Sequence, residues 1–184
     1  MTLEEEIEAK LKSHDVVFRY MQDSDINFIL NSWLSSYRNS LPVTHVPNDV
    51  YFPEQKKIIH SLLDNVSVLI IADSEDTSVD IGYIIGERKD NFFIIDWVYV
   101  KHLFKNFGLA QTLIHFLAGK DVEKIVFTHQ PKETNRYFVD CLSKYYKLEF
   151  NPYLQQRHLK EYHEANPYTD IPISSPRWRL KNKF

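Results

Sequence analysis

One short segment carries the residues best suited to binding a ligand. An apolar run, residues 92–100, precedes it, and Lys105, Gly108 and Ala110 follow with the spacing Lys-x-x-Gly-x-Ala before an amphipathic run over 111–118. Such a turn points backbone N–H groups outward at the beginning of a helix, where the helix dipole favours negative charge. The chain has only 4 glycines, so a glycine here is less expected by chance. The pattern predicts a phosphate-binding loop if a strand precedes it and a helix follows. A simple helix start is the alternative.

A single carboxylate interrupts the same apolar run. In a strand, Asp96 would share a face with Val98 and Val100 unless a bulge intervenes. Burial would raise the pKa of its carboxyl group and allow it to accept an amine proton near neutral pH. Asp96 is therefore the candidate general base, and an ion pair with a neighbouring basic residue is the alternative. His102 and His129 are weaker candidates, because a histidine just after a strand is usually solvated.

The elements that position these residues follow from the spacing of apolar side chains. Helical periodicity predicts helices, while alternation and short apolar runs predict strands. The polar segments 73–78 and 88–91 are turn-like, so the strands around them should form an antiparallel meander. The predicted helices are residues 2–12, 26–37, 53–64, 108–118 and 133–146, and the predicted strands are 16–21, 67–73, 80–87, 92–100, 124–128 and 148–153.

Length and composition indicate a globular protein of one domain, and the mixture of predicted helices and strands indicates the α/β class. The chain has 184 residues, of which 43% are hydrophobic and 26% charged, enough for one substantial core. We expect residues 1–15 to form an N-terminal helical extension and residues 16–184 to form a single domain. The single cysteine, Cys141, excludes an internal disulfide, and no cysteine–histidine spacing matches a zinc site, so we expect no metal.

Targeting signals are not apparent in the sequence. The N-terminus is acidic and lacks the apolar segment of a signal peptide, and the longest apolar run, residues 66–72, is too short to cross a bilayer. We therefore expect a cytoplasmic protein without a membrane partner, either a monomer or a homodimer.

The order of these elements, with Lys105-x-x-Gly108-x-Ala110 after the fourth strand, resembles the GCN5-related N-acetyltransferase (GNAT) superfamily. The pyrophosphate-binding signature of that family is usually (Gln/Arg)-x-x-Gly-x-(Gly/Ala), so Lys105 departs from the usual residue. Residues 145–150 are similar to the Tyr-x-Lys-x-Gly-Phe sequence that closes the last helix of the family. Residues 32–38, Ser-Trp-Leu-x-Ser-Tyr-Arg, resemble small GNAT-like proteins of bacteriophages. The resemblance implies a mixed, mostly antiparallel central sheet flanked by helices and splayed between the fourth and fifth strands.

The resemblance also implies acetyl-CoA as cofactor and a set of contacts for it. Tyr145 takes the position of the family's general acid, which protonates the leaving thiolate, although it could be an ordinary aromatic residue. The asparagine that contacts the cofactor in many members is Phe138 here, and Asn135, one helical turn earlier, is its candidate substitute. The backbone of Val98, Tyr99 and Val100 would bind the pantetheine arm and acetyl carbonyl, and the pyrophosphate would lie on Lys105, Asn106, Phe107, Gly108, Leu109 and Ala110.

The acceptor side of the fold is implied to lie near the connection between the second and third predicted helices. Trp33 and Tyr37 most simply pack in the core, and Arg38, His45 and Tyr51 would then face the acceptor. These cationic and aromatic groups suit an anionic or planar acceptor.

The expected function is an acetyl-CoA-dependent N-acetyltransferase that acts directly on an amine of a small molecule or protein. Two alternatives stay open. One is a phage Mom-like DNA base-modifying protein of the same fold, for which the basic residues 177–183 would serve, although the net charge of -3 does not favour nucleic acid. The other is a non-catalytic member that binds CoA or a partner protein.

Overall fold

The computed structural model describes residues 3–40, 42–119, 121–129, 139–140 and 142–159. Its α-helices are α1 (Leu3–Ser13), α2 (Ile26–Arg38), α3 (Asn48–Leu63) and α4 (Leu109–Ala118). Its strands are β1 (Val16–Tyr20), β2 (Ser67–Asp73), β3 (Asp80–Arg88), β4 (Phe92–Val100), β5 (Lys124–Phe127) and β6 (Lys147–Phe150). Three short 3-10 helices are η1 (Asp23–Asp25), η2 (His102–Phe104) and η3 (Pro152–Gln156).

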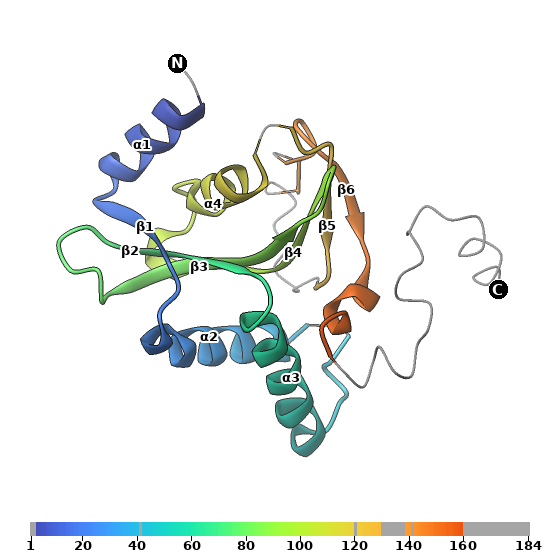
Figure 1. Ribbon diagram of the computed structural model, residues 1–184. Coiled ribbons are helices and arrows are strands. Elements are labelled where there is room, and N and C mark those ends of the chain that lie inside the picture. The colour runs from blue at the N-terminus through green and yellow to red at the C-terminus, as the bar shows by residue number, and fades with distance from the viewer. Residues whose placement is uncertain (1–2, 41, 120, 130–138, 141, 160–184) are drawn as a thin grey trace.

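The strands form one six-stranded sheet in the order β1-β2-β3-β4-β5-β6. The first four strands pair antiparallel, whereas β4, β5 and β6 pair parallel. Helices α1 and α4 cover one face, and α2 and α3 cover the other (Figure 1). This confirms the predicted mixed α/β sheet flanked by helices.

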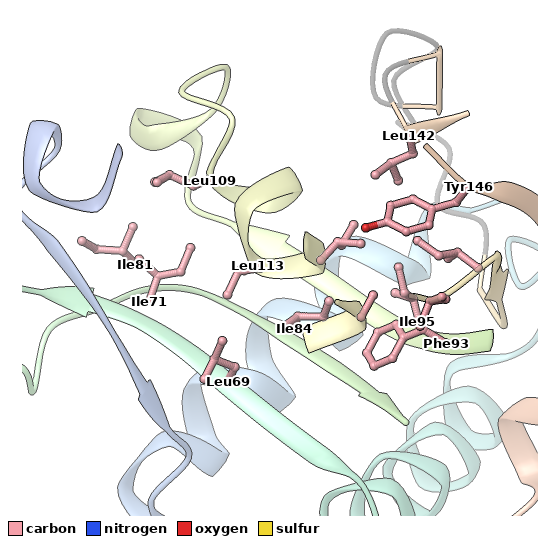
Figure 2. Close-up of a cluster of buried hydrophobic side chains, with 14 of the residues drawn as sticks. Leu69, Ile71, Ile81, Ile84, Phe93, Ile95, Leu109, Leu113, Leu142 and Tyr146 are labelled. Carbon is pink, nitrogen blue, oxygen red and sulfur yellow. The ribbon is translucent and has the colours of Figure 1, made fainter. Parts of the chain in front are cut away.

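Each face of the sheet carries its own core, because side chains alternate between the faces along a strand. In β2, Leu69 and Ile71 point to the α4 side, whereas Val68 and Ile70 point to the α2 side. The α4-side core, most of which is drawn in Figure 2, contains Val16, Leu69, Ile71, Ile81, Ile84, Phe93, Ile95, Leu109, Leu113, Ile114, Ala118, Val122, Ile125, Leu142 and Tyr146. The α2-side core contains Ile29, Trp33, Leu34, Tyr37, Tyr51, Ile58, Ile59, Leu62, Leu63, Val68, Ile70, Ala72, Tyr83, Ile85 and Trp97.

The helix predicted over 133–146 lies partly outside the described residues, and the other predicted elements are present, with differences at their ends. Helix α3 begins at Asn48 rather than at Pro53, so Pro53 lies inside it. Tertiary packing explains the earlier start, since Tyr51 in the first turns is buried and its hydroxyl donates to the carbonyl of Leu34 over 2.9 Å. Helix α1 packs against β1 and α4, and its Leu11 contacts the α4-side core. The predicted N-terminal extension therefore lies against the rest of the fold.

Candidate functional site

Strands β4 and β5 separate part-way along the sheet. Their parallel pairing ends where Ile95 lies opposite Phe127, although β4 continues to Val100. At this fork the N–H of Thr128 donates to the carbonyl of Ile95 over 3.0 Å. Beyond the fork, residues 97–100 pair with β3 on one side and with no described strand on the other. This is the splay expected between the fourth and fifth strands.

A one-residue bulge in β4 lies at the fork. Ile85 of β3 is opposite Trp97, whereas Gly86 is opposite Ile95, so Asp96 has no partner in β3. An extra residue of this kind bends the strand and exchanges the faces to which later side chains point. The ladder continues past the bulge with a new register.

The bulge corrects one expectation about Asp96. The sequence placed Asp96 on the same face as Val98 and Val100 unless a bulge intervened, and the bulge does intervene: the two valines pack against the α4-side core. Asp96 sits at the bulge itself and contacts Thr128 and Arg157. The simple alternation on which the expectation depended ends at this residue.

The open edge of β4 presents backbone groups that pair with none of the described strands. The N–H of Lys101 donates to Ile81 of β3 over 2.9 Å, so the backbone groups of Tyr99, two residues earlier, also point to β3. By the same alternation, the N–H and C=O groups of Val98 and Val100 point to the opposite edge, where β5 has ended. The open edge can therefore pair with an extended, amide-containing ligand.

The loop after β4 has the context that the phosphate-binding hypothesis requires. It joins β4 to α4 through η2, and Gly108 is the N-cap of α4 with a φ of 75°. This left-handed conformation favours glycine. Asn106 also has a positive φ, 70°, a conformation that asparagine tolerates better than most residues. Lys105 and Phe107 are exposed, and the Phe107 ring stacks on His14 with 4.5 Å between centroids.

Several amides at this helix start have no protein acceptor. The N–H of Lys105 donates to His102, and the N–H of Thr112 donates to Gly108. Within the described part of the chain, the N–H groups of residues 106–111 between them make no hydrogen bond to the protein. These amides lie at the positive end of the α4 dipole, so the loop can bind a phosphate group.

The Asp96 carboxylate is held in a buried ion pair at the fork. Arg157, which follows η3, donates from Nη1 and Nη2 to the two carboxylate oxygens, each over 2.7 Å. Thr128 Oγ1 donates to Oδ1 over 3.1 Å. Arg157 Nε also donates to Glu87 Oε2 of β3 over 2.7 Å. The Asp96 side chain is 0% exposed and that of Arg157 is 9% exposed, so water does not screen the pair.

Burial and charge oppose each other in this pair. Burial raises the pKa of Asp96, and the hydrogen bonds from Arg157 act against that rise. For Arg157, burial lowers the pKa, but the hydrogen bonds to Asp96 and Glu87 outweigh burial and the pKa is raised. For Glu87, burial is likewise outweighed by Lys89 and Arg157, and the pKa is lowered to about 2. The geometry matches the ion-pair alternative for Asp96 rather than a free general base.

A buried histidine continues this network on the α2 side. Burial lowers the pKa of His129 to about 3, so the ring is neutral at physiological pH. Its Nδ1 lies 2.8 Å from Thr128 Oγ1, and its Nε2 lies 3.2 Å from Gln55 Nε2. Since Thr128 donates to Asp96, the consistent arrangement has His129 Nδ1–H donating to Thr128 and Nε2 accepting from Gln55. With both nitrogens engaged, His129 positions the fork and does not offer a free base.

Tyr145 lies at the other end of β5. It is 63% exposed, in the turn before β6, and its ring contacts His115 edge-on with 5.1 Å between centroids. Lys147 of β6 is opposite Lys124, the first residue of β5, whereas the fork lies at Phe127. The length of β5, about 10 Å, therefore separates this turn from the fork. The structure does not bring Tyr145 and Asp96 together.

The three predicted acceptor residues do not form one surface. Tyr51 is 2% exposed in the α2-side core, which corrects its assignment to the acceptor side. Arg38 donates to the carbonyls of Val43 and Val46 and to Asn48 Oδ1, so its guanidinium is used to hold the α2–α3 connection. Of the three, His45 alone is exposed. Polar backbone in that connection requires a donor, and Arg38 supplies it.

The sequence did not indicate Arg157 or Gln55, which complete the network at the fork. Arg157 lies 61 residues from Asp96 in the chain, in a polar stretch without periodicity, so no local pattern identifies it. Asn135 and the basic residues 177–183 lie outside the described residues.

Solved structures with a similar fold include several acetyltransferases. A protein of Pyrococcus furiosus provisionally described as an acetyl transferase matches with a TM-score of 0.52 and 15% identity, over 72% of this chain and 93% of that chain. A possible acetyltransferase from Clostridium difficile 630 matches with a TM-score of 0.49 and 17% identity, over 74% and 93%. The PaiA N-acetyltransferase of Thermoplasma acidophilum, in complex with coenzyme A, matches with a TM-score of 0.46 and 12% identity, over 70% and 87%.

At these identities the likeness shows the fold, and the argument below uses the first of the three. No family model matches the chain, and no curated protein matches its sequence. None of the helices in the described ranges is long and apolar enough to span a membrane.

Proposed function

We propose, from the premise that this chain has the fold of the GNAT acetyltransferases, that it is an acetyl-CoA-dependent N-acetyltransferase. One observation carries the proposal. The open edge of β4 beyond the fork leads directly into a loop whose amides, residues 106–111, have no acceptor in the part of the chain that the structure describes. The edge suits an extended chain with amide groups, and the loop suits a pyrophosphate. Coenzyme A contains these two parts joined in that order.

The residues present fit this ligand. Its pyrophosphate would accept hydrogen bonds from the amides of residues 106–111, and Lys105 would add a positive charge beside it. Its pantetheine arm would pair with the backbone of Val98 and Val100 in the manner of an added strand. The backbone groups of Tyr99 face β3, so Tyr99 would not bond the pantetheine arm directly and would only hold Val98 and Val100 in the strand.

Acyl transfer to an amine requires an oxyanion donor, an acid and a proton acceptor. Acetyl-CoA, when bound, supplies the thioester that the amine attacks. The N–H groups of Val98 and Val100 are the donors available at the open edge for the developing oxyanion. Tyr145 remains the proposed acid for the leaving thiolate, on its place in the sequence pattern. Because three donors occupy the Asp96 carboxylate, we assign the amine proton to solvent or to an exposed histidine.

A non-catalytic CoA-binding protein is the second candidate. The occupied carboxylate of Asp96 and the distance of Tyr145 from the fork favour it, since neither side chain is then placed to transfer a proton at the open edge of β4. Incubation with acetyl-CoA and a panel of small-molecule and peptide amines distinguishes the two. Release of free thiol that depends on an amine identifies an enzyme, and binding without release identifies the second candidate.

Calorimetric titration with CoA tests the binding that both candidates share. Gly108→Ala should weaken CoA binding about tenfold or more, since a side chain there strains the left-handed N-cap and moves the amides. Gly119→Ala is the matched control, because Gly119 has a φ of 76° at the other end of the same helix. Wild-type protein that is folded and does not bind CoA would refute the proposal.

A further inference from the structure

The ion pair between Asp96 and Arg157 joins the segments that meet at the fork. Asp96 is the bulge residue of β4, Thr128 is the first residue after β5, and Glu87 belongs to β3. Arg157 is bonded to Asp96 and Glu87, and Asp96 is bonded to Thr128. The side chains thus link β3, β4, the end of β5 and the segment after η3 at the point where β4 and β5 part.

The position of this cluster matters more than its energy. A buried ion pair is often no more stabilising than apolar residues of similar size, because desolvation offsets the attraction. What the three hydrogen bonds to the Asp96 carboxylate provide is direction. The two parallel bonds from Arg157 hold the carboxylate in the plane of the guanidinium. The orientation of the Asp96 side chain, and with it the bulge, is therefore determined by contacts outside β4.

The bulge in turn determines which backbone groups reach the open edge. If Asp96 instead continued β4 as a regular strand residue, without the bulge, the faces and edges of all later residues would be exchanged, and the backbone groups of Val98 and Val100 would point toward β3. The open edge used in the proposed function therefore depends on Asp96 occupying the extra position.

We propose that Arg157 is a positioning residue for cofactor binding, which holds the Asp96 bulge so that β4 presents the backbone of Val98 and Val100 to the pantetheine arm. This inference rests on the proposed function. It assigns a role to the segment after β6, and it assigns Asp96 to the same structural unit rather than to proton transfer.

The test replaces the whole ion pair, because removing one partner would leave a buried charge and could prevent folding. The double variant Asp96→Leu/Arg157→Met keeps the volume of the site approximately and removes both charges. The matched control is Arg19→Met/Asp25→Leu. Arg19 and Asp25 form a similar two-bond pair beside β1, at the far edge of the sheet.

Two measurements are made on wild type and both double variants, each first shown to be folded by circular dichroism. Calorimetry gives the Kd for CoA, and hydrogen exchange followed by NMR gives the protection of the Trp97 and Tyr99 amides without any ligand. We expect the Asp96→Leu/Arg157→Met protein to bind CoA at least about tenfold more weakly and to exchange these amides at least about tenfold faster. The control should change neither by more than about twofold.

Each outcome has one meaning. Wild-type CoA affinity and exchange in Asp96→Leu/Arg157→Met would overturn the positioning role, as would equal losses in the control, which would indicate a general loss of stability. If wild-type protein binds no CoA, the proposed function fails, and the exchange of Trp97 and Tyr99 still decides whether Arg157 holds the bulge. If neither double variant folds, Arg157→Lys replaces the first, and unchanged exchange in that variant overturns the role.

Discussion

The guanidinium of Arg38 lies over the ring of Tyr51, 5.1 Å from its centroid, while its N–H groups bond the carbonyls of Val43 and Val46. One cation thus satisfies the backbone of the α2–α3 connection and packs on a core residue. The connection that the sequence assigned to acceptor binding is held in place by the residues that were expected to bind the acceptor.

Arg38→Ala should therefore lower stability without a selective effect on an acceptor. Loss of the hydrogen bonds and the ring contact should cost about 1–3 kcal/mol, measured by urea denaturation. Tyr51→Phe removes only the bond to Leu34 and should cost about 1 kcal/mol. An Arg38→Ala protein with wild-type stability and a raised acceptor KM would restore the original assignment.

Tyr145→Phe tests the proposed acid. If the hydroxyl protonates the thiolate, kcat should fall about 10²–10⁴-fold with nearly unchanged CoA affinity. Tyr20→Phe is the control, since Tyr20 is a similarly exposed tyrosine on β1. Tyr145 is exposed and contacts His115, so its position alone does not predict a large loss of kcat, and such a loss would be strong support for its role as the acid. If both variants had the wild-type kcat, Tyr145 would not be the acid.

His129 should make stability depend on pH. Its pKa is lowered by burial from 6.5 to about 3, so the unfolded chain binds a proton below pH 6.5 that the folded protein does not bind. The contribution of neutral His129 to the free energy of unfolding should therefore be complete above pH 6.5. Below that pH, the free energy of unfolding should fall by up to about 1.4 kcal/mol per pH unit toward pH 3. His129→Gln should flatten this dependence, whereas replacing the exposed His60 should not. If the free energy of unfolding had the same pH dependence in wild type and His129→Gln, the lowered pKa of His129 would be contradicted.

Glu87 should add a second dependence at lower pH. Its pKa is lowered from 4.5 to about 2, so the ionised carboxylate stabilises the folded protein above pH 4.5. This contribution is lost as the pH falls from 4.5 toward 2, where the folded protein also takes up the proton. Glu87→Gln should reduce the slope in that window, measured by denaturation between pH 5 and 2. A Glu87→Gln protein with the wild-type slope would show that the contacts of Glu87 with Lys89 and Arg157 do not favour its ionised carboxylate in the folded protein.

The turn that leads from β4 into α4 and the strands of the sheet could be predicted because their signals are local. The β-branched and aromatic side chains of Val98, Tyr99 and Val100 predicted a strand. The residues beside Gly108 predicted that a helix begins there. The polar turn segments 73–78 and 88–91 between short apolar runs also predicted the meander from β2 to β4, whose strands each bury both faces.

Tertiary structure alone decided what Asp96, Tyr51 and Arg38 do. The bulge at Asp96 depends on the register against β3, and its partner Arg157 comes from a segment 61 residues away, so no pattern within β4 contains either fact. Tyr51 was expected at the acceptor side because the family resemblance implied that the connection between the second and third predicted helices lies there, but contact with Leu34 of α2 buries it. Local sequence specifies the backbone conformations that a chain prefers, whereas the pairing of buried polar groups depends on which distant donors the fold brings within reach.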